Sequence, residues 1–283
     1  MPIPRLIALT ALAMLAFAGN SLLCRAALRH TPIDPASFTL VRLASGAVVL
    51  ALLVRLRGPV AGGRGSWASA LALLAYAAGF SYAYTSLSAG TGALMLFGAV
   101  QVTMIGYGLT RGERLRRPQM AGLTLAFAGL VGLVLPGLAA PPLLGSVLMM
   151  GAGVAWGVYS LRGRGAGDAT QVTAGNFARA VPLALLMSAA AWPQAQWDAA
   201  GLAYAVASGA LASGIGYAIW YTALPGLQPT QAATVQLSVP VIAALGGIAL
   251  LGEPLTWRLA LASLAILGGI ALVIWQRARP TRP

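Results

Sequence analysis

The sequence predicts an all-α integral membrane protein with ten transmembrane helices arranged as two inverted five-helix repeats. Of its 283 residues, 59% are hydrophobic and only 8% are charged, whereas a soluble domain carries about 25% charged residues. Apolar runs of about 20 residues, the length that crosses a hydrocarbon core, recur about ten times. The second half of the chain also repeats short patterns of the first half. A water-soluble domain does not fit in the remaining residues.

The spans were placed where apolar windows lie between polar breaks. The first window lacks a cleavage site of small residues and continues into polar sequence at 20–25, so we expect a retained helix and no removed signal peptide. The repeats are predicted to divide the chain into 1–138 and 139–283. In order, the expected spans are 6–24, 36–54, 67–88, 91–110, 119–135, 143–161, 172–191, 200–223, 230–250 and 257–275.

The basic residues predict the orientation of these spans. All 18 are Arg, and 13 of them fall in segments that alternate spans place on the same side as the N-terminus. Arg25, Arg29 and Arg258 fall on the other side, and Arg42 and Arg179 lie inside spans. Because cytoplasmic loops are enriched in basic residues, we expect both termini in the cytoplasm. The net charge of +13 is thereby explained without a nucleic-acid partner.

The internal duplication indicates an inverted repeat. The pattern Gly-Glu-x-Leu at 112–115 recurs at 252–255, and Tyr-Thr at 84–85 recurs at 221–222. Each predicted half holds five spans, an odd number, so the second half enters the membrane from the opposite side. This is the architecture of many secondary transporters, in which the binding site lies near the bilayer midplane. Aquaporin-type channels also contain inverted repeats, so the symmetry alone does not separate a carrier from a channel.

These features resemble a known family. Ten spans in two repeats, the duplicated Gly-Glu-x-Leu corner, an aromatic residue followed by small residues in the first helix of each half (Phe17, Trp156) and Pro240 in the ninth span are similar to the drug/metabolite transporter superfamily. Within it the chain resembles the EamA-type exporters and looks closest to the YddG-type aromatic amino acid exporters. The resemblance implies a multi-pass carrier of the bacterial inner membrane that exports amino acids or related metabolites, sometimes drugs.

Candidate pathway residues are the aromatic and amide side chains inside spans, because polar groups in a membrane tend to face the bundle interior. Tyr76, Phe80 and Tyr84 recur every fourth residue and share a helix face, with Tyr82 pointing elsewhere. Ring faces with a few amides would suit an amino acid with an apolar side chain. Helix packing, interfacial belts and interhelical hydrogen bonds are the competing interpretations. The predicted cavity-lining residues are Phe17, Asn20, Tyr82, Gln101, Trp156, Tyr159, Tyr217, Tyr221 and Gln236.

Other intramembrane residues have a structural and a functional interpretation. Pro240 can kink the ninth span and make it a gating helix, or it can mark a static kink. Arg42 and Arg179 could hold a substrate carboxylate, but snorkelling to the interface or capping carbonyls of a neighbouring helix is favoured, since both positions are shallow enough to snorkel. Glu113 and Glu253 are interpreted as structural, each near a helix N-terminus.

The sequence argues against catalysis and against cofactors. A chain without Lys has no phosphate loop of the Gly-x-x-x-x-Gly-Lys type, and one Cys with one His does not supply an ordinary zinc site. All five acidic residues fall near span ends, so no mid-membrane proton carrier is evident. We expect a monomeric secondary transporter of amino acids, in contact with the lipid bilayer, that works by alternating access as facilitated diffusion or exchange. The alternatives are a channel, or a non-catalytic transmembrane subunit or scaffold of a larger complex.

Overall fold

The fold was analysed in a computed structural model of the chain. The structure describes residues 1–58, 62–112, 116–135, 137, 140–163, 165–227 and 229–278, without the side chains of 229, 230, 233, 234 and 275–278. Within these residues the regular structure is helical and contains no strand. Glu113 and Leu115 of the first Gly-Glu-x-Leu corner lie outside the described residues.

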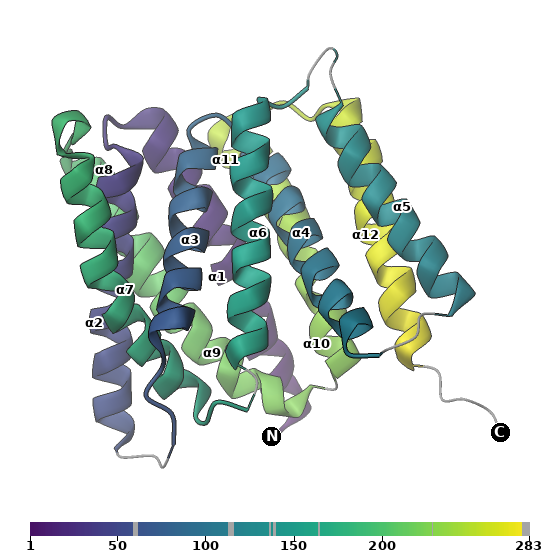
Figure 1. The fold of residues 1–283 in the computed structure, drawn as a ribbon, viewed down its shortest axis with the longest axis horizontal. Helices are drawn as coiled ribbons and strands as arrows, with labels where there is room; N and C mark the ends of the chain where they lie inside the picture. The colour runs from purple at the N-terminus through teal and green to yellow at the C-terminus, as the bar shows by residue number, and fades with distance from the viewer. Residues whose placement is uncertain are drawn as a thin grey trace.

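The helices run alternately up and down through one bundle (Figure 1). α1 begins and α12 ends at the same end of the bundle, which is the lower end in Figure 1. In order they are α1 (Ile3–His30), α2 (Pro35–Arg57), α3 (Trp67–Tyr84), α4 (Ala89–Thr110), α5 (Arg117–Val134), α6 (Leu143–Gly163), α7 (Ala169–Ala190), the 3-10 turn η1 (Trp192–Gln194), α8 (Ala199–Val206), the π-helix η2 (Ala207–Ile215), α9 (Gly216–Ala223), the 3-10 turn η3 (Leu224–Gly226), α10 (Pro229–Gln236), α11 (Ser238–Leu251) and α12 (Trp257–Ala278).

Aspartate caps define where three of the helices begin. Asp34 accepts hydrogen bonds from the backbone N–H groups of Ala36 and Ser37, both at 2.9 Å. Asp168 and Asp198 do the same at the start of α7 and α8, at 2.8 and 2.7 Å. A side-chain acceptor at this position satisfies N–H groups that have no partner within the helix. These three carboxylates therefore have structural roles at helix ends.

The protein is a multi-pass membrane protein. Among the described residues, eight helical segments are long and apolar enough to cross a bilayer. Large apolar side chains on their outer faces are exposed, for example Ile7 at 63% and Leu186 at 69%, as expected for contact with lipid. The predicted spans at 67–88 and 230–250 correspond to α3 and to α10 with α11, which are not among the eight. The total of ten spans and the orientation of the termini stay predictions.

Three predicted spans differ in detail from the helices. α1 continues to His30, so Arg25, expected in an outer segment, is inside a helix. The span at 200–223 contains the π-helix η2, a widened turn that is frequent at functional sites. The span at 230–250 is interrupted at Leu237, between α10 and α11. Pro240 has no N–H for the carbonyl of Gln236, which explains a break at this point.

The helix contacts match the pairing that an inverted repeat predicts. α2 packs against α7 and α5 against α12, and these are helices that the predicted repeat makes equivalent. The predicted repeat makes α1 the counterpart of α6, and it makes α3 the counterpart of the segment α8–α9. The contact of α3 with α6 then has its counterpart in the contact of α8–α9 with α1. In the same way, the contact of α4 with α6 has its counterpart in the contact of α11 with α1. Exchanging the halves leaves this list unchanged. The division at residue 138 stays a prediction, and this pairing is what supports it.

Candidate functional site

A cavity of about 560 Å³ lies inside the bundle and is lined mainly by α1, α3, α4, α6, α7 and α9. Its wall reaches the lower end of the bundle, because it includes Arg111, Gly163 and Ala169, which lie where α4 and α6 end and α7 begins. Its deepest residues include Ser21 and Phe80, in the upper parts of α1 and α3. The cavity is thus open towards the lower end and stops short of the upper one.

An aromatic cluster centred on Trp156 forms the middle of the wall. The indole of Trp156 stacks on Tyr159, with ring centroids 5.1 Å apart, and on Tyr217, at 5.4 Å and an interplanar angle of 17°. The Tyr76 ring lies 4.7 Å away, and Phe17 packs against Tyr217 at 5.7 Å. Four helices contribute these rings, which present a continuous apolar and polarisable surface to the cavity.

Most of the predicted cavity residues come together in this wall. They are Phe17, Asn20, Gln101, Trp156, Tyr159, Tyr217, Tyr221 and Gln236. Whether they bind a substrate stays a prediction. Pro240 is buried in α11, one turn beyond the break in the helix and outside the wall.

Tyr82 was placed wrongly in the cavity wall. Its side chain is 37% exposed and is not part of the lining. Successive helix residues are rotated by about 100°, so Tyr82 lies on the other side of α3 from the stripe of Tyr76 and Phe80. Those two residues line the cavity in its place.

A chain of polar side chains closes the deep end of the wall. The Tyr76 hydroxyl oxygen accepts hydrogen bonds from Arg42 Nη2 at 2.9 Å and from Asn20 Nδ2 at 3.3 Å. Asn20 Oδ1 in turn accepts from the hydroxyl of Ser208 at 2.6 Å, which the π-helix η2 brings to this position. Tyr76 and Asn20 face the cavity. Sequence reasoning missed Ser208, because the π-helical turn that orients it has no distinctive residue pattern.

Arg42 is buried, contrary to the expectation that it snorkels. It is 2% exposed, and its guanidinium carbon lies 4.8 Å from the ring centre of Phe80 and 5.2 Å from that of Tyr76. Its Nε and Nη1 atoms have no hydrogen-bond partner in the described part of the chain. Arg179 instead donates to the carbonyl of Gly175 in its own helix and to that of Arg64, in the connection that precedes α3, and not to the carbonyls of a neighbouring helix.

A second polar group lies nearer the mouth. Asn176 donates to the Tyr159 hydroxyl at 3.3 Å and accepts from the backbone N–H of Ser66 at 2.8 Å. Thr173 lies 3.4 Å from the Tyr221 hydroxyl. These contacts hold the hydroxyl groups of Tyr159 and Tyr221, two of the tyrosines that line the cavity.

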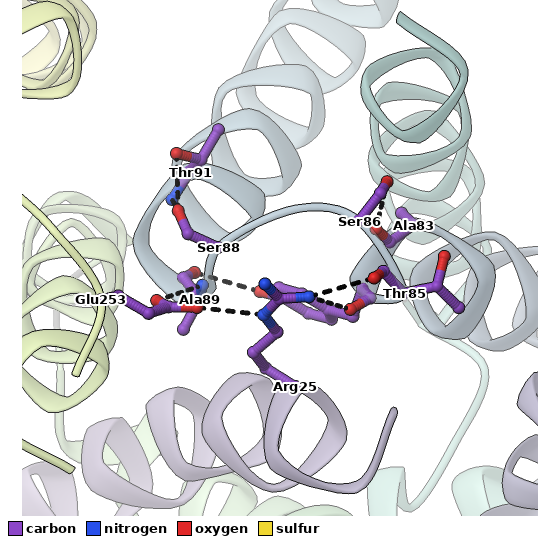
Figure 2. Close-up of polar contacts among 9 residues, drawn as sticks. Arg25, Ala83, Thr85, Ser86, Ser88, Ala89, Thr91 and Glu253 are labelled. Atoms are coloured by element: carbon purple, nitrogen blue, oxygen red, sulfur yellow. Dashed lines mark hydrogen bonds and ion pairs between the residues drawn. The ribbon is translucent and has the colours of Figure 1, made fainter. Parts of the chain in front are cut away.

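A buried ion pair lies near the upper end of the bundle. Arg25 Nε donates to Glu253 Oε1 at 3.0 Å, and the two side chains are 5% and 7% exposed. Arg25 also donates to the carbonyls of Tyr84 and Thr85, at 2.8 and 3.2 Å. Figure 2 shows Arg25 reaching from α1 between Glu253 and the end of α3. One residue thus joins the first half of the chain to the connection between α11 and α12.

Glu253 has the electrostatic role that was expected, but at a different helix. Its Oε2 accepts from the backbone N–H of Ala89 at 2.8 Å, in the first turn of α4 (Figure 2). A negative charge at this position is stabilised by the helix dipole. With Glu253 paired and three Asp residues capping helices, each described carboxylate has a structural partner, and none lines the cavity.

Comparison with known proteins relates the second part of the chain to a family of membrane transporters. The sequence model of the EamA-like transporter family matches residues 143–275. The chain is 60% identical over 278 residues to the uncharacterized protein PA1977 of Pseudomonas aeruginosa, covering 98% of this chain and 97% of that protein. It also superimposes on a crystal structure with a TM-score of 0.69 at 19% identity, covering 99% of this chain and all of the other, a likeness of fold alone.

Proposed function

We propose that this chain is a secondary transporter that moves amino acids with aromatic or other apolar side chains across the bacterial inner membrane. Its residues 143–275 match the EamA-like transporter family. The family supports a membrane transporter of small molecules. The substrate class is argued from the cavity. The single observation that carries it is the cluster around Trp156, a stacked aromatic surface beside a few neutral polar groups.

The cavity suits one small substrate with an apolar part. Its volume of about 560 Å³ lies within the usual range for small-molecule sites of about 300–1,000 Å³. The rings offer faces on which an apolar or aromatic side chain can stack, and Gln101 and Gln236 add amides that can orient polar substrate atoms. One chain supplies all of these groups, which supports a monomer as the working unit.

Alternating access supplies the transport mechanism. The cavity is open towards the lower end, and the Arg25–Glu253 pair closes the upper end one helical turn beyond Ser21. In the alternate state this pair separates and the lower end closes. The break in the helix at Leu237, beside Gln236 of the cavity wall, supports a gating role for the helix that contains Pro240. If both termini are cytoplasmic, the open end faces the cytoplasm, as an exporter requires for loading.

The test is counterflow in proteoliposomes. Vesicles containing purified protein and excess unlabelled phenylalanine receive trace labelled phenylalanine outside, with protein-free vesicles as the control. Transient accumulation of label is the expected result, because a carrier exchanges one bound substrate for another. Flux through a channel would instead not saturate and would not depend on substrate on the opposite side. Folded protein that gives no accumulation with phenylalanine, methionine or threonine would overturn the proposed substrate class.

A further inference from the structure

We propose that the Tyr76 hydroxyl, polarised by Arg42, forms a subsite for a carboxylate, so that the substrates of this cavity are organic acids or zwitterions and not cations. This inference rests on the proposed function and specifies the substrate class of the same cavity. The observation behind it is a buried guanidinium without a carboxylate partner, directly behind the cavity wall.

The hydrogen bonds of Tyr76 leave one group free to bind a substrate. A tyrosine hydroxyl can donate one hydrogen bond and accept up to two. Both N–H groups that reach the Tyr76 oxygen, from Arg42 and Asn20, can only donate to it. The hydrogen of the hydroxyl therefore remains as a donor, and within the described residues it has no acceptor. Because Tyr76 lines the cavity, a substrate oxygen can accept this hydrogen.

Arg42 makes that donor selective for a negative charge. Its guanidinium is 2% exposed and two of its nitrogens have no partner among the described residues. A buried charge of this kind is costly and is ordinarily paired. The rings of Tyr76 and Phe80 partly stabilise it, but a ring face carries no net charge. A carboxylate bonded to Tyr76 would lie within a few ångströms of Arg42 in a site of low dielectric, where the attraction is strong.

The other charges near the cavity favour the same sign of substrate. No described Asp or Glu lines the wall, and each described carboxylate is held at a helix end or in the Arg25 pair. Arg111, in the wall near the mouth, adds a further positive charge. A cationic substrate would find ring faces and neutral polar groups but no carboxylate among the described residues of the wall. An amino acid can place its carboxylate at Tyr76 and its side chain on the rings around Trp156.

A set of phenylalanine analogues separates the requirements for each charge. Phenylalanine, 3-phenylpropionate and 2-phenylethylamine share the phenyl group but are a zwitterion, an anion and a cation at neutral pH. Each is added as a competitor in counterflow of labelled phenylalanine, and its binding is measured by the change in intrinsic tryptophan fluorescence. We expect the acid to bind within about tenfold of phenylalanine and the amine at least about tenfold more weakly than the acid, since hydrogen bonds to charged groups have this effect.

Substitutions test whether Tyr76 and Arg42 cause the preference for the acid over the amine. Tyr76→Phe keeps the ring and removes the donor, so the ratio of acid to amine affinity should fall about tenfold or more. Arg42 is a positioning residue, and Arg42→Gln should reduce the same ratio, with partial recovery in Arg42→Lys. Tyr204→Phe, outside the cavity wall, and Arg179→Gln, whose side chain caps carbonyls, are the matched controls and should keep the ratio. If Arg42→Gln does not fold, Tyr76→Phe still decides the question.

The outcomes distinguish the two proposals. If none of the three compounds binds to folded protein, the proposed function fails. If the amine binds as well as the acid, or if Tyr76→Phe leaves the ratio unchanged, the carboxylate subsite is refuted while the aromatic cavity stands. Competition by phenylalanine but not by 3-phenylpropionate would also overturn it, because the carboxylate would then not be the recognised group.

Discussion

Replacing Glu253 by Gln should open the upper end of the transporter. Glu253 and Arg25 are 7% and 5% exposed, so solvent screening is small. Removing one partner of a buried ion pair costs about 3–5 kcal/mol. The amide of Glu253→Gln can still accept from the Ala89 N–H, so we take the lower value. If the pair forms only in the state described here, this cost shifts the equilibrium towards the alternate state by about 100-fold.

The opening can be measured by labelling one engineered cysteine. Ser21 lies at the deep end of the cavity, and the chain has a single native cysteine, Cys24. In a Cys24→Ala, Ser21→Cys background, a membrane-impermeant maleimide applied from the upper side should label Glu253→Gln at least ~10-fold faster than the parent, a conservative fraction of the shift. Vesicles of the two orientations provide access from each side.

Two further variants make the result decisive. Asp198→Asn changes a carboxylate to an amide at the same end of the bundle but keeps a helix cap, so its labelling should match the parent. The double variant Arg25→Met, Glu253→Leu should restore slow labelling, since apolar pairs often replace buried ion pairs without loss of stability. Unchanged labelling of Glu253→Gln, together with a lowered melting temperature, would refute the gate and make the pair a constraint on the fold alone.

Three other predictions test the wall, the packing and a loop. Trp156→Ala removes the ring on which the substrate side chain is proposed to stack, a contact of about 0.5–1.5 kcal/mol beyond its buried area, so phenylalanine should bind at least about tenfold more weakly by counterflow competition. Trp197→Ala, at an exposed position outside the wall, should bind phenylalanine as the parent does. Gly153→Ala places a Cβ 2.6 Å from an atom of α4 and should lower the free energy of unfolding by about 1–3 kcal/mol. Gly151→Ala meets no atom within 4 Å and should raise the free energy of unfolding by about 0.5–1 kcal/mol. Equal effects of the two variants in thermal unfolding would contradict the close contact of α6 with α4 at Gly153. Partial burial alone would raise the pKa of Asp34, but hydrogen bonds from Ser37, Gln196 and Ala36 outweigh it and hold the pKa below its usual range. The stability that the ionised carboxylate adds is complete above the unfolded pKa of about 3.9 and is lost as the pH falls through the lower folded pKa. The melting temperatures of the parent and of Asp34→Asn should therefore converge in acid and differ by a constant amount above about pH 5.

The spans could be predicted from the sequence because apolar length is a direct consequence of the bilayer. The helices in the described residues lie within a few residues of the predicted windows, and departures have local causes. Asn20 to Arg25 was interpreted as the end of a span because it is polar, but Glu253, 228 residues away, neutralises Arg25 inside the bundle. Only the three-dimensional structure reveals such a partner. The charge of Arg25, read from the sequence alone, therefore made the predicted span end too early.

The site was predictable where side chains share a helix face and unpredictable where the backbone departs from an α-helix. The cluster of Trp156, Tyr159 and Tyr217 follows from helical spacing and from the rule that polar groups face the interior. Tyr82 was chosen for its residue type against its angular position, and its exposure follows from that position. Ser208 reaches Asn20 through a π-helical turn, which changes the angle of every residue after it. No pattern of residue types marks that turn.

Arg42 and Arg179 show how two equivalent positions can acquire different roles. Both lie in the second helix of their predicted half, and those two helices, α2 and α7, pack against each other. Arg179 meets the carbonyl of Arg64, in the connection that precedes α3, and of Gly175 in its own helix. Arg42 is enclosed by α3 and η2, where helical hydrogen bonds already use the carbonyls, so Tyr76 is its one hydrogen-bond acceptor among the described residues. A guanidinium whose N–H groups are already bonded within the protein has little left to attract a substrate, whereas a guanidinium with unpaired N–H groups can attract one. The unpaired nitrogens of Arg42 are therefore what locates the proposed anion subsite beside the cavity, on the side of α2 and α3.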